Sequence, residues 1–170
     1  MSAKEEQKEI EKRIRPSWDE YFLQIMDVVG RRSTCDRGFA AAVIVKDKQI
    51  LTTGYSGSPA GLPHCDEVGH DLHEVKHPDG SVTTHCLRTT HSEQNAICQA
   101  AKFGISINGA TLYTRYEPCY ACAKMIINTG IIRVVCIRKY HGASVTRKIF
   151  KEAGVKFDVL TNELETYDNM

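Results

Sequence analysis

Two short motifs constrain the fold of this chain more than any other feature of its sequence. The first is His91-Ser92-Glu93, and the second is Pro118-Cys119-Tyr120-Ala121-Cys122. Each motif lies where a helix is predicted to begin, and the spacing of the two cysteines places both thiols on one helical face. Two helix starts that are distant in sequence must therefore meet if the histidine and the cysteines are to bind one ion.

His91, Cys119 and Cys122 are ligands of the kinds that zinc prefers. With three protein ligands a tetrahedral zinc ion keeps one open position, which is typical of a catalytic site. Zinc lowers the pKa of bound water to about 7, and helix N-termini favour the thiolate form of cysteine. The alternative interpretation is a closed structural site with a fourth protein ligand.

Glu93 follows His91 at a distance that lets its carboxylate reach metal-bound water without binding zinc itself. Its expected role is to take the water proton, protonate a ring nitrogen, and later protonate the departing amine as ammonia. H-x-E followed by P-C-x-x-C is the signature of zinc deaminases. The sequence therefore predicts hydrolytic deamination of a nucleobase, with Glu93 as the catalytic residue.

The charge balance indicates what kind of partner to expect. The 170 residues contain 22 Lys and Arg against 21 Asp and Glu, a formal net charge of +1. A net charge this close to zero does not indicate the excess of basic residues that a stable nucleic-acid partner requires. A small anionic substrate needs only a few arginines to hold its phosphate. The candidates, which the sequence does not rank, are Arg31, Arg32, Arg37 and Arg115.

The sequence predicts a cytoplasmic protein with no membrane segment. Residues Met1–Arg15 alternate charges without an apolar run, so we expect no signal peptide. The longest apolar stretch, Phe39–Val45, is too short to cross a bilayer. The seven cysteines are an odd number and are better explained as thiols and metal ligands than as a disulfide framework.

The fold class predicted is α/β, with one deaminase domain over residues 1–170. A charged helix is expected within residues 1–15, and Ser17 with Glu20 forms a capping box for a second helix whose apolar stripe begins at Trp18. A strand pair, a long irregular stretch and a βα alternation follow. This order predicts a mixed five-stranded sheet in a three-layer α/β/α arrangement, ending in a loose tail over 161–170.

The chain resembles the deoxycytidylate (dCMP) deaminase family of the cytidine/deoxycytidylate deaminase superfamily. The resemblance runs from Trp18 to about Leu160 and rests on segments spread over that length. They are Arg32-Ser33-Thr34-Cys35, Ala42-Val43-Ile44-Val45, Thr53-Gly54-Tyr55-Ser56-Gly57, His91-Ser92-Glu93-Gln94-Asn95-Ala96-Ile97, Gly109-Ala110-Thr111-Leu112-Tyr113 and Pro118-Cys119-Tyr120-Ala121-Cys122-Ala123-Lys124.

The resemblance implies a cytidine-deaminase-like fold and conversion of dCMP to dUMP, the supply route to thymidylate. It also implies a homohexamer that dCTP activates and dTTP inhibits, with Mg²⁺ accompanying a nucleoside triphosphate effector. The family pattern places Tyr140 beside the base as a stacking residue. An ordinary, partly buried aromatic side chain is the alternative role for this tyrosine.

Two departures from the family pattern bear on the site. Ser92 stands where the family usually has alanine, and the turn Gly54-Tyr55-Ser56-Gly57 has serine in place of the usual asparagine. This turn is associated with nucleotide contacts, and we expect effectors to bind near it. Ser56 offers one hydroxyl in place of a carboxamide. The substitution therefore bears on effector binding or the sugar contact, and not on the zinc chemistry.

A second metal site is predicted within the long irregular stretch Ser56–Thr90. Related deaminases often carry a further, structural zinc in these regions, and Cys35, Cys65, His70 and Cys86 are the candidate ligands. Metal binding would stabilise a loop that has no core of its own. Alternatively, the cysteines are reduced and pack as small apolar groups. Competitors for the fourth ligand position are His64, His73 and His85.

Three other functions compete with dCMP deamination. The same zinc chemistry acts on bases in tRNA or single-stranded DNA, but that predicts a basic, aromatic-lined groove, which the near-neutral charge does not favour. A second rival is deamination of free guanine or a pteridine-like base. A third is a non-catalytic nucleotide sensor, against which the intact Glu93 argues.

Overall fold

The computed structural model describes residues 14–76 and 80–165. Most of the charged helix expected within residues 1–15 lies outside the described residues, and Ile14 and Arg15 are not helical. Five helices longer than one turn and eight strands make up the described chain. They are α1 (Trp18–Gly30), β1 (Ala41–Lys46), β2 (Gln49–Tyr55), α2 (Cys65–Val68), β3 (Leu72–Lys76), β4 (Val82–Cys86), α3 (Ser92–Phe103), β5 (Thr111–Tyr116), α4 (Tyr120–Asn128), β6 (Arg133–Tyr140), α5 (Ser144–Glu152), β7 (Lys156–Val159) and β8 (Leu164–Glu165).

The central sheet is mixed, as the sequence predicts. Its five main strands run in the order β2-β1-β5-β6-β7. Strand β1 pairs antiparallel with β2 and with β5, whereas β5, β6 and β7 are parallel. Parallel neighbours require a crossover, and helices α4 and α5 supply the two crossovers of this half of the sheet.

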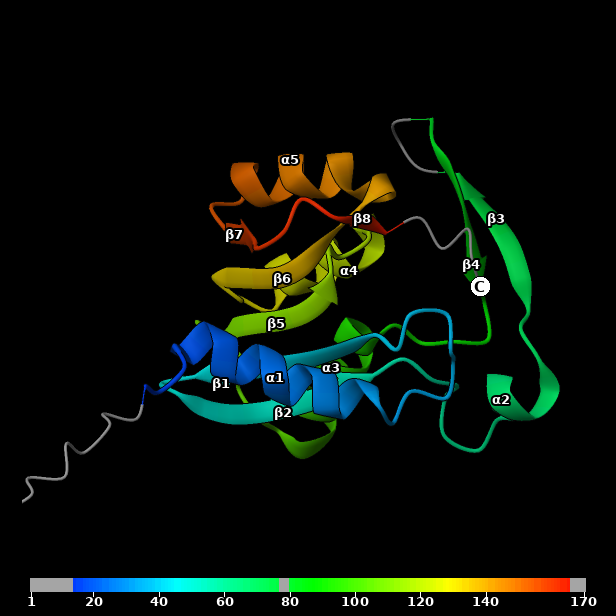
Figure 1. Cartoon of the computed structure of the whole chain (residues 1–170), viewed down its shortest axis with the longest axis horizontal. Coiled ribbons are helices and arrows are strands. Elements are labelled where there is room, and N and C mark those ends of the chain that lie inside the picture. The colour runs from blue at the N-terminus through cyan, green and yellow to red at the C-terminus, as the bar shows by residue number, and fades with distance from the viewer. Residues whose placement is uncertain (1–13, 77–79, 166–170) are drawn as a thin grey trace, which may run out of the picture.

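Helices cover both faces of the sheet, which confirms the three-layer arrangement (Figure 1). Helix α1 packs on one face, where Phe22 and Met26 contact the odd-numbered residues of β1. Helices α3, α4 and α5 pack on the other face around Ile44 and Leu112. Side chains alternate across a strand, so β1 contributes to both cores with consecutive residues.

Helix α1 begins at the predicted capping box: Ser17 Oγ accepts from the backbone of Glu20, and the carboxylate of Glu20 accepts from the backbone of Ser17. Its apolar stripe is only partly core. Phe22 and Met26 are buried, whereas Trp18 is 51% exposed and lies flat against Phe22. The apolar stripe of α1 is wider than the part of the helix surface that the sheet covers, so apolar residues at the edge of the stripe remain exposed to solvent.

Residues 56–90 are more regular than predicted. The segment contains the short helix α2 and the antiparallel hairpin β3–β4, which projects from the body of the molecule (Figure 1). In the register of the hairpin Leu72 is opposite Cys86. Strand β3 is mostly exposed, whereas β4 buries Thr83 and Cys86. Neither sequence has the apolar alternation that identifies a half-buried strand.

The C-terminal segment also differs from the loose tail that was predicted over 161–170. Within the described part, Leu164–Glu165 forms β8, which pairs with β6 beside Lys139 and Tyr140. Backbone bonds from Thr161 to Ile137 and from Lys139 to Glu163 attach the segment to the end of β6. Residues 166–170 lie outside the described residues.

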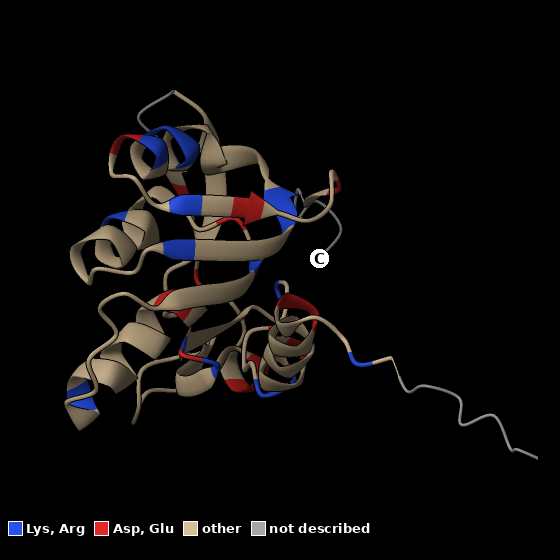
Figure 2. Ribbon diagram, turned by 90° about the vertical axis from the view of Figure 1, so that its left-hand side faces the viewer, with Lys and Arg blue, Asp and Glu red and all other residues tan. Residues whose placement is uncertain are grey.

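Charged residues of both signs are interspersed over the ribbon, as Figure 2 shows for one side of the molecule. Among the described residues, no helix combines the length and the apolar character that crossing a membrane requires.

Candidate active site

The structure brings His91, Cys119 and Cys122 together at the starts of α3 and α4. His91 and Cys119 are the N-cap residues of the two helices, and Cys122 lies in the first turn of α4. The Nδ1 atom of His91 is 3.5 Å from Sγ of Cys119 and 3.4 Å from Sγ of Cys122. A tetrahedral zinc with usual bond lengths places such ligand atoms about 3.5 Å apart. The three side chains therefore fit a zinc ion.

The electrostatics of this group suit a cation. A hydrogen bond from the Cys122 thiol lowers the pKa of Cys119 to about 3, with burial opposing and His91 assisting. The same contact raises the pKa of Cys122. Burial disfavours a charge on His91, but the Cys119 thiolate and Glu93 raise its pKa to about 9. Negative charge thus gathers where zinc would bind, and zinc would displace the remaining protons.

Glu93 lies in the first turn of α3, and its side chain lines a cavity together with the metal ligands His91 and Cys119. Burial raises the pKa of its carboxyl, and the nearby His91 acts in the opposite direction. The Ser92 hydroxyl donates to Oε2 of Glu93 at 3.0 Å. Burial thus favours the protonated form of this carboxyl relative to a carboxyl in solvent, which suits a group that takes up and returns a proton in general acid–base catalysis.

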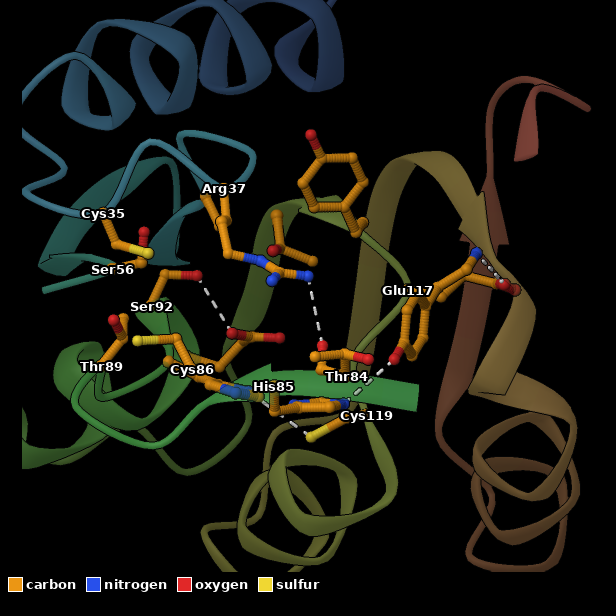
Figure 3. A pocket seen from close by; sticks show the side chains of 16 residues that line it. Cys35, Arg37, Ser56, Thr84, His85, Cys86, Thr89, Ser92, Glu117 and Cys119 are labelled. Atoms are coloured by element: carbon orange, nitrogen blue, oxygen red, sulfur yellow. Dashed lines mark hydrogen bonds between the residues drawn. The ribbon is translucent and has the colours of Figure 1, made fainter. Parts of the chain in front are cut away.

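The cavity is lined by residues from the loop before β1, the turn after β2, strand β4 of the hairpin, the start of α3, and the ends of β5 and β6. Arg37 and Thr84 meet at its edge, where Nη2 of Arg37 donates to the carbonyl of Thr84 at 3.3 Å (Figure 3). Of the arginines proposed to hold a phosphate, Arg37 lines the cavity, whereas Arg115 pairs with Asp27 at 2.7 Å.

Tyr140 and His85 form one wall of the cavity. Tyr140 is 4% exposed, and its hydroxyl is 3.1 Å from Nε2 of His85. The ring of His85 stacks on that of His91, with 5.6 Å between centroids. From the sequence, His85 is an alternative ligand of the second metal site, but the structure places it in the catalytic cavity. The neighbouring Cys86, a member of the second candidate ligand set, lines the same cavity.

The turn Gly54-Tyr55-Ser56-Gly57 lies between the catalytic cavity and the solvent. Ser56 lines the cavity, whereas Tyr55 is on the exposed side and its carbonyl accepts from Asn95. Gly54 packs so closely against α3 that a Cβ there would clash with the backbone of Ser92 and Ala96. Gly57 pairs with Thr90 in a single β-bridge. The turn therefore fixes the start of α3 as well as lining the cavity with Ser56.

Glu117 is a cavity residue that the sequence analysis did not identify. It precedes Pro118 and is buried, and it pairs with Arg147 of α5. The only signal in the sequence is a carboxylate immediately before the metal-binding motif. The sequence does not show that this carboxylate is buried or that the guanidinium of Arg147 is its partner.

The second predicted ligand set also converges. Cys35, Cys65, His70 and Cys86 present ligand atoms that all lie within 4.8 Å of one another. Sγ of Cys65 is 3.6 Å from Sγ of Cys86, and Sγ of Cys35 is 3.8 Å from Nδ1 of His70. The other nitrogen of His70 is 2.9 Å from Asp36, an arrangement typical of metal-binding histidines.

The competing histidines have other partners. His64 Nδ1 is 3.0 Å from Thr34 Oγ1, and His73 Nε2 is 2.9 Å from Asp71. Within the cluster, burial opposes ionisation of Cys86, but hydrogen bonds from Thr89, Asp71 and Cys65 lower its pKa to about 6. Zinc binds cysteines as thiolates, so an ion bound here would also displace the protons of the other thiols.

The fold and the site together define a zinc-dependent hydrolytic deaminase: two helix N-termini hold a His-Cys-Cys centre, and a buried glutamate lies beside it in a cavity. The chain belongs to the cytidine and deoxycytidylate deaminases. The family model for the cytidine and deoxycytidylate deaminase zinc-binding region matches residues 16–138.

Three comparisons illustrate the relationship. ComE operon protein 2 of Bacillus subtilis is 38% identical over 141 residues, which cover 83% of this chain and 70% of that protein. The deoxycytidylate deaminase of Mycobacterium phage D29 is 41% identical over 124 residues, covering 71% of this chain and 94% of the phage protein. The crystal structure of dCMP deaminase from cyanophage S-TIM5 in complex with dCMP and dUMP superposes with a TM-score of 0.67 at 27% identity, covering 86% of this chain and 99% of that one.

Proposed function

We propose that this chain catalyses the hydrolytic deamination of dCMP to dUMP and ammonia, and so supplies dUMP for thymidylate synthesis. The observation that carries the proposal is the buried carboxyl of Glu93 in a cavity beside His91, Cys119 and Cys122. The choice of dCMP is supported by the phage relative named deoxycytidylate deaminase and by the cyanophage structure with dCMP and dUMP.

Zinc held by His91, Cys119 and Cys122 would supply Lewis acidity that lets a water molecule lose its proton near neutral pH. Glu93 receives that proton and passes it to the ring nitrogen of cytosine. The oxygen of water bonds to C4, and Glu93 then takes the second proton of that oxygen and transfers it to the exocyclic amine, which leaves as ammonia when its bond to C4 breaks. The atoms of dCMP and water are then those of dUMP and ammonia.

The cavity wall orients the base for this reaction. Tyr140 and His85 offer an aromatic surface beside the metal ligands, against which a pyrimidine ring can pack. Arg37 at the cavity edge is positioned to pair with the 5′-phosphate. Recognition of the phosphate distinguishes a free nucleotide from a nucleoside or a bare base.

Several further properties belong to the proposal. Cys35, Cys65, His70 and Cys86 hold a second, structural zinc, which their convergence supports. The resemblance to dCMP deaminases supports a cytoplasmic homohexamer that dCTP activates and dTTP inhibits, with Mg²⁺ bound to the triphosphate. The balanced formal charge of +1 supports the view that nucleic acid is not a stable partner.

The test is a side-by-side assay of ammonia release from dCMP, CMP, dCTP and single-stranded DNA. We expect the highest kcat/KM with dCMP, and a loss of about 10²–10⁴-fold in Glu93→Gln at unchanged zinc content. A preference for single-stranded DNA would contradict the substrate. Binding of dCMP without turnover would favour the nucleotide sensor.

A further inference from the structure

Glu117 places a carboxylate in the interior of the protein, between the catalytic cavity and α5. Its side chain is 0% exposed. It follows β5 directly and precedes Pro118 and Cys119, and its own N–H donates to the carbonyl of Arg138 at 3.1 Å. Burying a carboxylate is costly unless it is paired and hydrogen-bonded. The fold therefore has to supply partners for it.

Two elements supply those partners. Nε of Arg147 donates to Oε1 of Glu117 at 2.7 Å, and Nη2 of Arg147 donates to Oε2. The backbone N–H of Tyr140 donates to the same Oε2 at 2.8 Å. A two-point contact from a guanidinium fixes the plane of the carboxylate as well as its position. Glu117 consequently holds the end of β6 at a defined place.

Tyr140 is thereby held at two ends. The carboxylate of Glu117 accepts from its backbone N–H, and Nε2 of His85 lies 3.1 Å from its hydroxyl. His85 in turn stacks on the metal ligand His91. A continuous set of contacts therefore runs from α5 through Glu117, Tyr140 and His85 to the metal centre.

We infer that the Glu117–Arg147 ion pair is a positioning device that sets the place of Tyr140 against the substrate base. This inference rests on the proposed function and adds two positioning residues to it. Neither is expected to touch the reacting atoms. Both residues act through Tyr140. Loss of the ion pair is therefore expected to raise KM for the substrate more than it lowers kcat.

A purely structural role for the pair predicts something different. If the ion pair only attaches α5 to the sheet, its removal lowers stability and leaves the substrate affinity of the folded enzyme unchanged. Two measurements therefore distinguish the roles. One is the change in KM relative to the change in kcat, and the other is the protection of the Tyr140 amide from hydrogen exchange.

The test compares Arg147→Gln with Lys148→Gln in the zinc-loaded enzyme. Both substitutions remove one positive charge from α5, but Lys148 is 74% exposed and its Nζ lies 4.0 Å from Oε1 of Glu152. In Arg147→Gln we expect KM for dCMP to rise about tenfold with a smaller change in kcat, because slight misplacement of a positioning group is costly. Arg147→Lys should recover part of the loss, and Lys148→Gln should behave as wild type.

Hydrogen exchange of the Tyr140 amide provides a readout that needs no turnover. We expect faster exchange in Arg147→Gln and wild-type exchange in Lys148→Gln. Should Arg147→Gln fail to fold, the double variant Glu117→Gln/Arg147→Gln leaves no buried charge unpaired and is measured in the same way.

A folded Arg147→Gln or double variant with wild-type KM and wild-type exchange at Tyr140 would overturn the inference, whatever its melting temperature. Failure of the wild-type enzyme to deaminate dCMP would instead overturn the proposed function. In that case exchange at Tyr140 decides alone: faster exchange in the variant supports the positioning role, and unchanged exchange rejects it.

Discussion

The hydroxyl of Ser92 donates a hydrogen bond to Oε2 of Glu93, with 3.0 Å between the oxygens. Ser92 is 1% exposed and lines the same cavity as Glu93. The residue between the metal-binding histidine and the proposed proton carrier therefore contacts that carrier directly. Alanine, the usual residue of the family at this position, has no group that could make this contact.

Ser92→Ala is expected to lower kcat by about tenfold or less, because one lost hydrogen bond is worth about 0.5–1.5 kcal/mol. Glu93→Gln serves as the reference, since it removes the proton carrier itself. Rates on dCMP at saturating substrate and equal zinc content provide the measurement. A Ser92→Ala enzyme as inactive as Glu93→Gln would mean that the serine hydroxyl itself carries a proton.

The two clusters predict two zinc ions per chain. Cys65→Ser should remove one of them and lower the melting temperature, because metal binding contributes directly to the stability of a site of this kind. Cys98→Ser is the matched control, since Cys98 is exposed and lies outside both clusters. Elemental analysis gives the stoichiometry. One zinc in the wild type, unchanged in Cys65→Ser, would refute the structural site.

Asp19 is expected to make stability depend on pH. It accepts from Arg133 at 2.9 and 2.7 Å and from the Tyr113 hydroxyl at 2.8 Å, which joins α1 to the sheet. The hydrogen bonds from Arg133 lower its pKa, with burial opposing and Tyr113 assisting. A lowered pKa in the folded state means that the contribution is present above the unfolded value of 3.8 and is lost as pH falls through the folded value.

Asp19→Asn should therefore lower the free energy of unfolding at pH 7 by about 1 kcal/mol, since the pair is partly exposed and solvent screens it. The deficit relative to wild type should be smaller at about pH 3, below the unfolded value of 3.8, because the contribution is lost as the carboxyl takes up a proton. Asp27→Asn removes a carboxylate from the same helix that binds Arg115 through a single hydrogen bond, so its effect at pH 7 should be smaller. Urea unfolding at both pH values is the measurement, and a pH-independent deficit for Asp19→Asn would contradict the linkage.

The sequence predicts the sheet and the convergence of the metal ligands because both depend on short-range patterns. A continuous apolar run marks β1, and the offsets within the two motifs place His91 and Cys119 at helix starts. Other features depend on contacts between distant segments. Arg147 meets Glu117 only after two crossovers are made, and no periodicity in either segment records that meeting.

The hairpin β3–β4 was not predicted for a different reason. Its strands bury little apolar surface, so hydrophobic patterning does not mark them. His85 and Cys86 of β4 both line the catalytic cavity, and Cys86 also belongs to the second ligand cluster. The contacts of the hairpin are therefore made by polar and sulfur-containing side chains, whose partners are visible only in three dimensions.

Ser56 provides the last prediction, because the structure bears on whether it contacts substrate or effector. Its side chain is buried, lines the catalytic cavity and lies beside the hydroxyl of Ser33. Tyr55, its neighbour in the turn, is on the exposed side. We therefore expect a change at residue 56 to alter the binding of dCMP rather than the response to dCTP and dTTP.

Ser56→Asn should lower KM for dCMP by up to about tenfold, because a carboxamide offers a donor and an acceptor where serine has one hydroxyl, and each added hydrogen bond is worth about 0.5–1.5 kcal/mol. Ser56→Ala removes the hydroxyl without adding volume and should raise KM by a similar or smaller factor. Saturation curves for dCMP with and without each effector separate the two roles. If Ser56→Asn leaves KM unchanged in the absence of effectors but tightens the response to dCTP and dTTP, then residue 56 serves regulation, and the effector must reach it through the cavity.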